Sequence, residues 1–231
     1  MTILQTDSLS KSYGKYPALN NVNLTLESGK VIGLLGPNGS GKTTLLKIIA
    51  GLLTPTSGSV RIDGSEPGVK SKECVSFLPD TTFFPTWMKV KDTFDLFEDF
   101  YEDFNRNKAR EMLKNLDIPE DMQLKKMSKG TLEKVQLISA MSREAKLYIL
   151  DEPIGGVDPA TRDYILRTII GNYNENASVL ISTHLIADVE NVLDEAIFLQ
   201  KGEVKLHSSV DDIREKEGKS VDELFREVFA C

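Results

Sequence analysis

The sequence predicts an α/β fold whose buried strands are parallel, and three observations predict it. Mainly apolar runs, Val31–Leu35 and Leu147–Asp151, suit strands that are buried on both faces. A glycine-rich loop follows the first run, and a helix-forming run, Thr44–Ala50, follows the loop. This alternation of strand and helix is typical of parallel sheets covered by helices.

The loop carries a phosphate-binding pattern. Residues 36–43 read Gly-Pro-Asn-Gly-Ser-Gly-Lys-Thr and match G-x-x-x-x-G-K-[ST] at each fixed position. The glycines let backbone N–H groups point at an anion, Lys42 adds a positive charge for the outer phosphates, and the Thr43 hydroxyl can bind Mg²⁺. The residues predicted to bind the nucleotide here are Gly36, Asn38, Gly39, Ser40, Gly41, Lys42, Thr43 and Thr44.

Two carboxylates end the second apolar run. In phosphate-loop ATPases an acid at the end of such a strand holds the Mg²⁺ that the loop hydroxyl also touches, which predicts Asp151 as a metal ligand. Glu152 is then placed to polarise a water for attack on the γ-phosphate. The alternative is a strand that merely ends in solvated acids.

These features occur in the order found in the ATP-binding subunits of ABC transporters, which the chain resembles over nearly its whole length. By that resemblance Tyr13 stacks on adenine and His184 is a catalytic residue that contacts the γ-phosphate. Met-Ser-Lys-Gly-Thr at 127–131 falls where the family has its signature, usually Leu-Ser-Gly-Gly-Gln. Within it, Ser128 and Gly130 would bind the γ-phosphate of the nucleotide held by a second copy.

The resemblance implies a single domain, residues 1–231. Its parts are a phosphate-loop (RecA-like) ATPase core at about 1–79 and 140–210, an N-terminal antiparallel β-subdomain, an inserted helical subdomain at about 80–139 and a helical tail at 211–231. The alternating residues Val22–Leu26 suit the antiparallel strands, and further buried strands are predicted at 178–183 and 195–199. The tail is predicted to have one apolar face, formed by Val221, Leu224, Phe225 and Val228.

The same resemblance implies a mechanism that needs two copies of the chain, either identical or related. They close head to tail around ATP and Mg²⁺, with Gly155–Asp158 at their interface, and hydrolysis loosens the pair. A separate transmembrane permease subunit receives the motion, so the chain would power transport from the inner face of the cell membrane. The Ser-Lys-Gly signature resembles that of bacterial ABC-2-type exporters, which favours export of a peptide, drug or lipid-like compound.

Two regions depart from the family pattern. Asp80 stands where the family usually has a glutamine that senses Mg²⁺ and the attacking water, and we predict that its carboxylate reaches the metal. The alternative for Asp80 is an exposed loop acid. Lys129 and Thr131 alter the signature. Because of these departures, one alternative remains that the chain is the weakly or non-hydrolysing half of a heterodimer. A second alternative is an ABC ATPase that has no role in transport.

The inserted segment is rich in aromatic residues, because seven of the ten phenylalanines lie between 77 and 104. Helical spacing predicts one helical stripe packed inside the subdomain, formed by Phe94, Phe97, Tyr101 and Phe104. Phe83, Phe84 and Trp87 lack that spacing and follow Asp80, where the family has a groove for a short helix of the membrane subunit. Since exposed aromatic residues beside a functional loop commonly mark an interface, we predict that these three line the groove.

Composition narrows the functional class. The formal net charge of −7 argues against a nucleic-acid-binding protein, which needs a basic face. The start of the chain has no basic region typical of a secretory signal, and no run approaches ~18 apolar residues. Cys74 and Cys231 are too few for a disulfide scaffold or a metal cluster. We therefore expect a cytoplasmic protein without a nucleic-acid partner.

Overall fold

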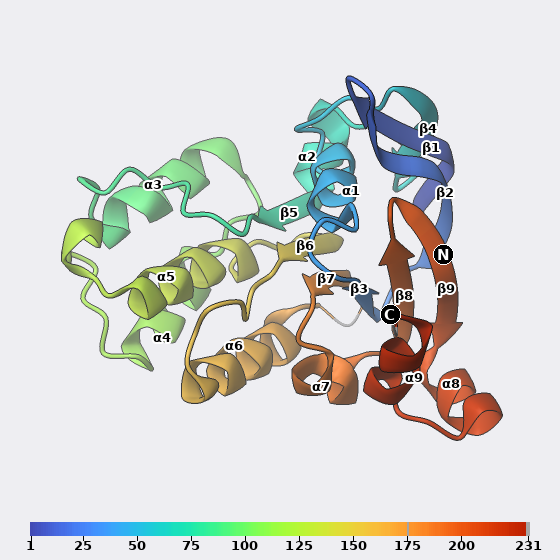
Figure 1. Cartoon of the computed structure of the whole chain (residues 1–231). Helices are drawn as coiled ribbons and strands as arrows, with labels where there is room; N and C mark the ends of the chain where they lie inside the picture. Colours follow the sequence, from blue (N-terminus) through green and yellow to red (C-terminus); the bar gives the residue numbers. More distant parts are fainter. Residues whose placement is uncertain (175, 230–231) are drawn as a thin grey trace.

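The computed structural model describes residues 1–174 and 176–229, and their strands form two sheets (Figure 1). The smaller sheet is antiparallel, in the order β2 (Tyr16–Glu27), β1 (Thr2–Tyr13) and β4 (Ser57–Ile62). The larger sheet has the order β5 (Val75–Leu78), β6 (Leu147–Asp151), β7 (Ser178–Thr183), β3 (Val31–Leu35), β8 (Glu195–Gln200) and β9 (Glu203–Ser209). Its paired strands are parallel except for β8 and β9.

The helices divide between the core and an insertion. Helix α1 (Lys42–Ile49) lies between the two sheets, because its leucines and isoleucines pack in one buried cluster with residues of both. The other core helices are α2 (Val69–Cys74), α6 (Pro159–Asn172), α7 (Ile186–Val189), the 3₁₀ turn Glu190–Val192, α8 (Val210–Glu217) and α9 (Val221–Val228). The insertion comprises α3 (Val90–Phe100), α4 (Arg106–Lys114), the 3₁₀ turn Leu124–Lys126 and α5 (Lys129–Met141), on the left of Figure 1.

The predicted buried strands are confirmed. Three of them have the predicted bounds, and the fourth, β8, extends one residue further than predicted. Strands β4, β5 and β9 were not predicted from the sequence. Strand β4 has only two buried residues, Val60 and Ile62, so its local pattern is weak, and pairing with β1 adds it to the antiparallel sheet. The antiparallel strands were expected within the first 30 residues, and β4 shows that the sheet also includes residues 57–62.

The helical insertion has an aromatic core that differs from the predicted stripe. Phe94, Phe97 and Phe104 are buried, and Phe104 lies 5.7 and 5.4 Å from the other two rings. The prediction of one continuous helical stripe is wrong, however, because α3 ends at Phe100 and the backbone of Tyr101 is extended. Tyr101 and Phe104 therefore reach the same cluster from the connection between α3 and α4.

Phe84 was expected to be exposed in a groove, and this expectation is wrong. Its side chain is only 4% exposed and packs against the rings of Phe83 and Phe97, because the loop that carries it folds back onto α3. Phe83 and Trp87 remain exposed, at 42% and 69%.

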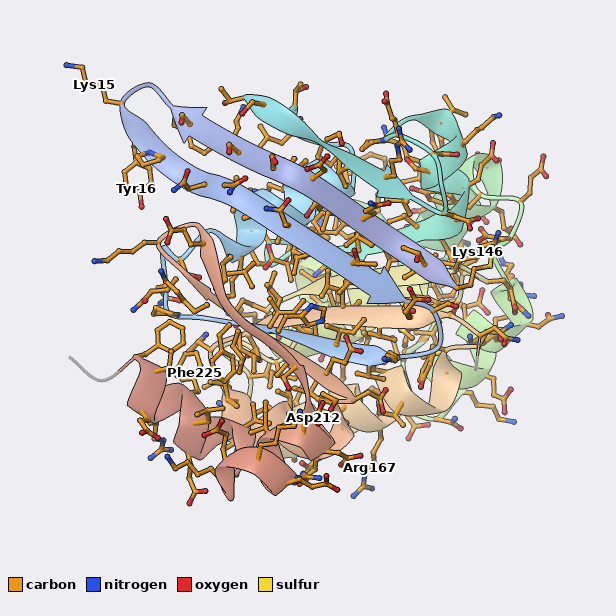
Figure 2. All side chains as sticks on the ribbon, turned by 90° about the vertical axis from the view of Figure 1, so that its right-hand side faces the viewer. Lys15, Tyr16, Lys146, Arg167, Asp212 and Phe225 are labelled. Atoms are coloured by element: carbon orange, nitrogen blue, oxygen red, sulfur yellow. The ribbon has the colours of Figure 1, made fainter. Side chains whose placement is uncertain are left out.

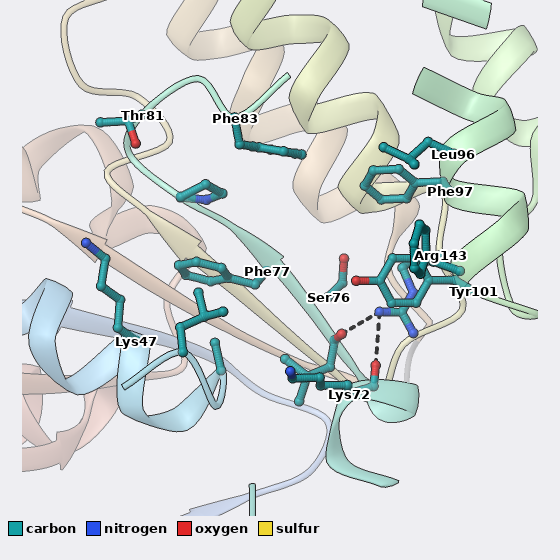
Figure 3. A pocket seen from close by; sticks show the side chains of 15 residues that line it. Lys47, Lys72, Ser76, Phe77, Thr81, Phe83, Leu96, Phe97, Tyr101 and Arg143 are labelled. Carbon is teal, nitrogen blue, oxygen red and sulfur yellow. Dashed lines mark hydrogen bonds between the residues drawn. The ribbon is translucent and has the colours of Figure 1, made fainter. Parts of the chain in front are cut away.

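A buried arginine joins the insertion to the core. The Arg143 guanidinium donates two hydrogen bonds to the Asp103 carboxylate, at 2.8 and 3.0 Å, and lies 3.7 Å from the Tyr101 ring. It also donates to backbone carbonyls at the end of α2 and the start of β5, two of which are drawn in Figure 3. Since Arg143 is 1% exposed, this network fixes the insertion beside β5.

The tail contains two helices, α8 and α9, the second of which ends at Val228. Val221 and Leu224 are buried as predicted, and the half-buried Phe225 packs edge-on against Phe198, whose ring centroid lies 5.3 Å away. The prediction is wrong for Val228, which is 40% exposed because it is the last residue of α9 and lies beyond the buried residues of that helix. Figure 2 shows Phe225 near the described end of the chain. Residue Cys231 lies outside the described residues. Within residues 1–174 and 176–229, no helix combines the length and the apolar character that crossing a bilayer requires.

Candidate functional site

The loop after β3 accepts only glycine at two positions, Gly36 and Gly41, because neighbouring backbone atoms leave no room for a side chain. A Cβ atom at Gly36 would lie 2.3 Å from the Leu199 carbonyl oxygen, and one at Gly41 would lie 2.5 Å from that of Ala18. Gly41 also has a φ of 110°. Helix α1 begins directly after it without a side-chain cap, so the first N–H groups of the helix are available to an anion.

Lys42 links this loop to Glu152, which directly follows β6. Its side chain is only 6% exposed, and its Nζ atom donates to the Gly36 carbonyl oxygen at 2.7 Å. The same atom lies 3.4 Å from Oε1 of Glu152. A buried ammonium group held between the loop and a carboxylate is placed to take up the charge of a phosphate.

Asp151 has one carboxylate oxygen in use and one without a partner. Ser182 and Thr43 donate hydrogen bonds to Oδ1, at 2.5 and 3.3 Å. Oδ2 is buried and accepts no hydrogen bond within the described residues. Burial raises the pKa of the Asp151 carboxyl, and the two hydrogen bonds oppose this. An orphaned carboxylate oxygen beside a threonine hydroxyl fits a hard cation such as Mg²⁺.

The two predicted catalytic residues lie in contact. The Glu152 Oε2 atom is 3.0 Å from Nδ1 of His184, which follows β7. Glu152 has a φ of 49°, a conformation that is rare outside glycine, and its backbone N–H is held by the carbonyl and hydroxyl oxygens of Ser182. Such a strained backbone is often found at functional sites, because the surrounding structure must hold it in place.

Asp80 lies at the same site. It follows β5 and lines a hollow of about 180 Å³ whose other lining residues are Asn38, Gly39, Ser40, Gly41, Lys42, Thr43, Thr44 and Glu152. Its charge contributes to the raised pKa of Asp151. The structure thus places Asp80, Glu152 and most of the predicted phosphate-loop residues around one hollow. Glu152 in turn contacts His184.

Three predicted nucleotide-binding residues lie elsewhere. Tyr13 ends β1 and is 51% exposed, and Figure 2 shows Lys15 and Tyr16 at the outward tip of the same hairpin. Ser128 caps α5, where its Oγ atom accepts a hydrogen bond from the backbone N–H of Thr131. Neither Ser128 nor Gly130 is among the residues that line the hollow beside the phosphate loop.

Sequence reasoning missed Ser182. Its hydroxyl group donates to Asp151 and accepts from the backbone N–H of Glu152, so it orients both acids. The signal was present, because Ser182 is a polar residue that follows the apolar run Val179–Ile181 and lies two residues before His184.

Comparison with known proteins decides the family. Residues 19–155 match the model of a family described as ABC transporter. The chain belongs to this family. It is 31% identical over 222 residues to the ABC transporter ATP-binding protein YhaQ of Bacillus subtilis, which is described as uncharacterised, covering 94% of this chain and 74% of YhaQ. It is also 31% identical over 229 residues to the lantibiotic transport ATP-binding protein SrtF of Streptococcus pyogenes, covering 96% of each.

A solved ATP-binding subunit of an ABC transporter has the same fold as this ABC protein. It superposes with a TM-score of 0.89 at 28% identity, covering 98% of this chain and 99% of the other. The predicted α/β fold with a RecA-like core is thereby confirmed. This chain is therefore the ATP-binding subunit of an ABC transporter, and its enzymatic class is that of an ATPase.

Replacing Lys42 with alanine is expected to weaken ATP binding by about 10–100-fold, because a charged hydrogen-bond partner of the phosphates is lost. Isothermal titration calorimetry measures this directly. Lys47→Ala, on the same helix but facing away from the phosphate loop toward the groove of Figure 3, is the matched control and should bind ATP normally. Equal affinity for all three proteins would remove Lys42 from the site.

Proposed function

We propose that this ABC subunit hydrolyses ATP between two copies of the chain and so drives transport through a separate transmembrane permease. The observation that carries the proposal is the meeting of Lys42 and Glu152, 3.4 Å apart, with His184 on the other oxygen of the same carboxylate. A phosphate-binding cation, a candidate general base and an orienting imidazole then surround one point, where a γ-phosphate and a water can react.

The residues divide the chemistry among them. The N–H groups of the phosphate loop and Lys42 bind the β- and γ-phosphates. Thr43, Asp151 and Asp80 would hold Mg²⁺, which draws charge from the phosphates when it is bound. Glu152 accepts a proton from water, whose oxygen bonds to the γ-phosphorus as the bond to ADP breaks, and His184 orients Glu152 and the γ-phosphate.

A second copy of the chain is proposed to complete each site. Ser128 and Gly130 start α5, whose first turn contains no acidic residue and contains Lys129. The positive end of this helix and the added lysine make its N-terminus a complement to phosphate. Since these residues do not line the hollow beside their own phosphate loop, we propose that they bind the γ-phosphate held by the second copy, while Tyr13 stacks on adenine.

The permease is proposed to dock in the groove between the insertion and the core. This groove encloses about 510 Å³, and Figure 3 shows Phe83, Phe97 and Tyr101 from the insertion side around it, with Phe77 and Lys47 opposite. Phe83 is partly exposed there, which supports the contact predicted for this residue. Trp87, which was also expected to line the groove, is not among its lining residues. The chain would thus lie in the cytoplasm against the membrane. Because SrtF is a lantibiotic transport protein, we propose export of a peptide, drug or lipid-like compound.

Glu152→Gln is expected to keep ATP binding and to lower hydrolysis by about 10²–10⁴-fold, because the amide cannot accept the proton of the attacking water. Phosphate release measures turnover, and size-exclusion chromatography with ATP should show the variant accumulating as a dimer. The matched control is Glu144→Gln, which makes the same substitution at an exposed glutamate and should hydrolyse ATP normally. Turnover of Glu152→Gln at the wild-type rate would refute the assignment of the base.

Asp80 is tested by two substitutions. Asp80→Asn keeps the size and removes the charge, so it should lower hydrolysis more than ATP binding if the carboxylate helps to hold metal or water. Asp80→Gln restores the usual family residue and should recover at least part of the rate. Turnover is measured across a Mg²⁺ titration, and identical curves for the three proteins would show that Asp80 is an exposed bystander.

A further inference from the structure

A second hollow, of about 300 Å³, lies on the other side of the proposed catalytic carboxylates. It is lined by residues from β5, α5, β6 and the loops that follow the strands, among them Asp80, Lys129, Glu133, Gln136, Asp151 and Glu152. Carboxylates dominate the polar wall of this hollow. Gln136 stands out because it brings the N–H donors of a side-chain amide to that wall.

Gln136 is a buried amide in an apolar stretch of helix. It is 3% exposed and lies in the run Val135–Met141 of α5, whose residues are all buried. A buried amide costs free energy unless it is hydrogen-bonded, and here Oε1 accepts the backbone N–H of Phe83 at 3.2 Å. A backbone N–H can only donate, so the oxygen is the atom that faces Phe83 and the NH₂ group is the other end of the amide.

This hydrogen bond holds the loop that begins at Asp80. The loop is also held at Phe84, whose buried ring packs against Phe97 of α3. Near its far end, the backbone N–H groups of Leu124 and Lys125 donate to the carbonyl oxygens of Met88 and Thr86, at 2.9 and 3.0 Å. The side chain of Gln136 thus holds the loop at Phe83, which is only three residues beyond Asp80.

We propose that Gln136 is a positioning residue that works as a pair with Asp80. The family usually has a glutamine at position 80, and this chain has a carboxylate there and an amide across the same hollow. The amide of Gln136 holds the loop and lines the same hollow as Asp80. In the proposed pair, its N–H donors act there with the Asp80 carboxylate in place of one glutamine. This inference rests on the proposed ATPase site.

The test is a double-mutant cycle at positions 80 and 136 in the full chain. Gln136→Met keeps the volume and removes the amide, and it should lower kcat by about tenfold with little change in the KM for ATP. Gln136→Glu keeps the acceptor for Phe83 but loses the N–H donors, so it should also lower kcat. Asp80→Gln in the Gln136→Met background should restore part of the rate, because an amide returns to the site from position 80 while Phe83 stays without its acceptor.

A second readout follows the loop without turnover. Hydrogen exchange at the Phe83 amide should become faster in Gln136→Met and stay slow in Gln136→Glu, because only the latter retains the acceptor. Ser139→Ala is the matched control. Ser139 is buried on the same helix, and among the described residues its hydroxyl group donates only to the Val135 carbonyl oxygen of its own helix. Both kcat and the exchange of Phe83 should therefore be unchanged.

The outcomes separate this inference from the proposed function. If Asp80→Gln fails to rescue Gln136→Met while Glu152→Gln is inactive, the ATPase site stands and the pairing of Gln136 with Asp80 is wrong. Unchanged exchange at Phe83 in Gln136→Met would overturn the anchoring role. If Glu152→Gln is fully active, the proposed site itself fails, whatever the cycle shows.

Discussion

The parallel register of β6, β7 and β3 is the constraint on which the site depends. Asp151 pairs with Ser182, and Leu35 pairs with Thr183, so the carboxyl ends of three strands meet at one edge of the sheet. The phosphate loop, the two acids and His184 each follow directly from one of these ends. Ser182, on the strand between the other two, then orients Asp151 by a 2.5 Å hydrogen bond. A shift of one residue in this register would turn these side chains to the other face of the sheet.

A second set of contacts connects this edge to the groove proposed for the permease. Strand β5 leads into Asp80 and the loop behind it, and that loop lines both the site and the groove. Arg143 holds the start of β5 to the connection between α3 and α4, while Gln136 holds the loop itself. These contacts join the insertion to the loop of Asp80, which lines the hollow beside the phosphate loop and would carry a movement of the insertion to the proposed site.

Much of this arrangement could be predicted from the sequence, and the failures have a common physical cause. Continuous apolar runs identified the buried strands, and the glycine spacing of residues 36–43 identified the loop, because both signals are local. The burial of Phe84, the end of α3 at Phe100 and the pairing of β4 with β1 depend on tertiary contacts that local spacing does not encode. Gln136 was missed for the same reason, since its partner is 53 residues away in the sequence.

The central claim is that each reaction site takes its phosphate loop from one copy of the chain and its signature from another. Mixing two inactive variants, Lys42→Ala and Gly130→Asp, tests this claim most directly. In a mixed pair, one of the two sites retains both Lys42 and Gly130, so the account predicts that ATP hydrolysis partly returns on mixing. A mixture as inactive as either variant alone would contradict it, because each chain would then need its own loop and its own signature in the same site.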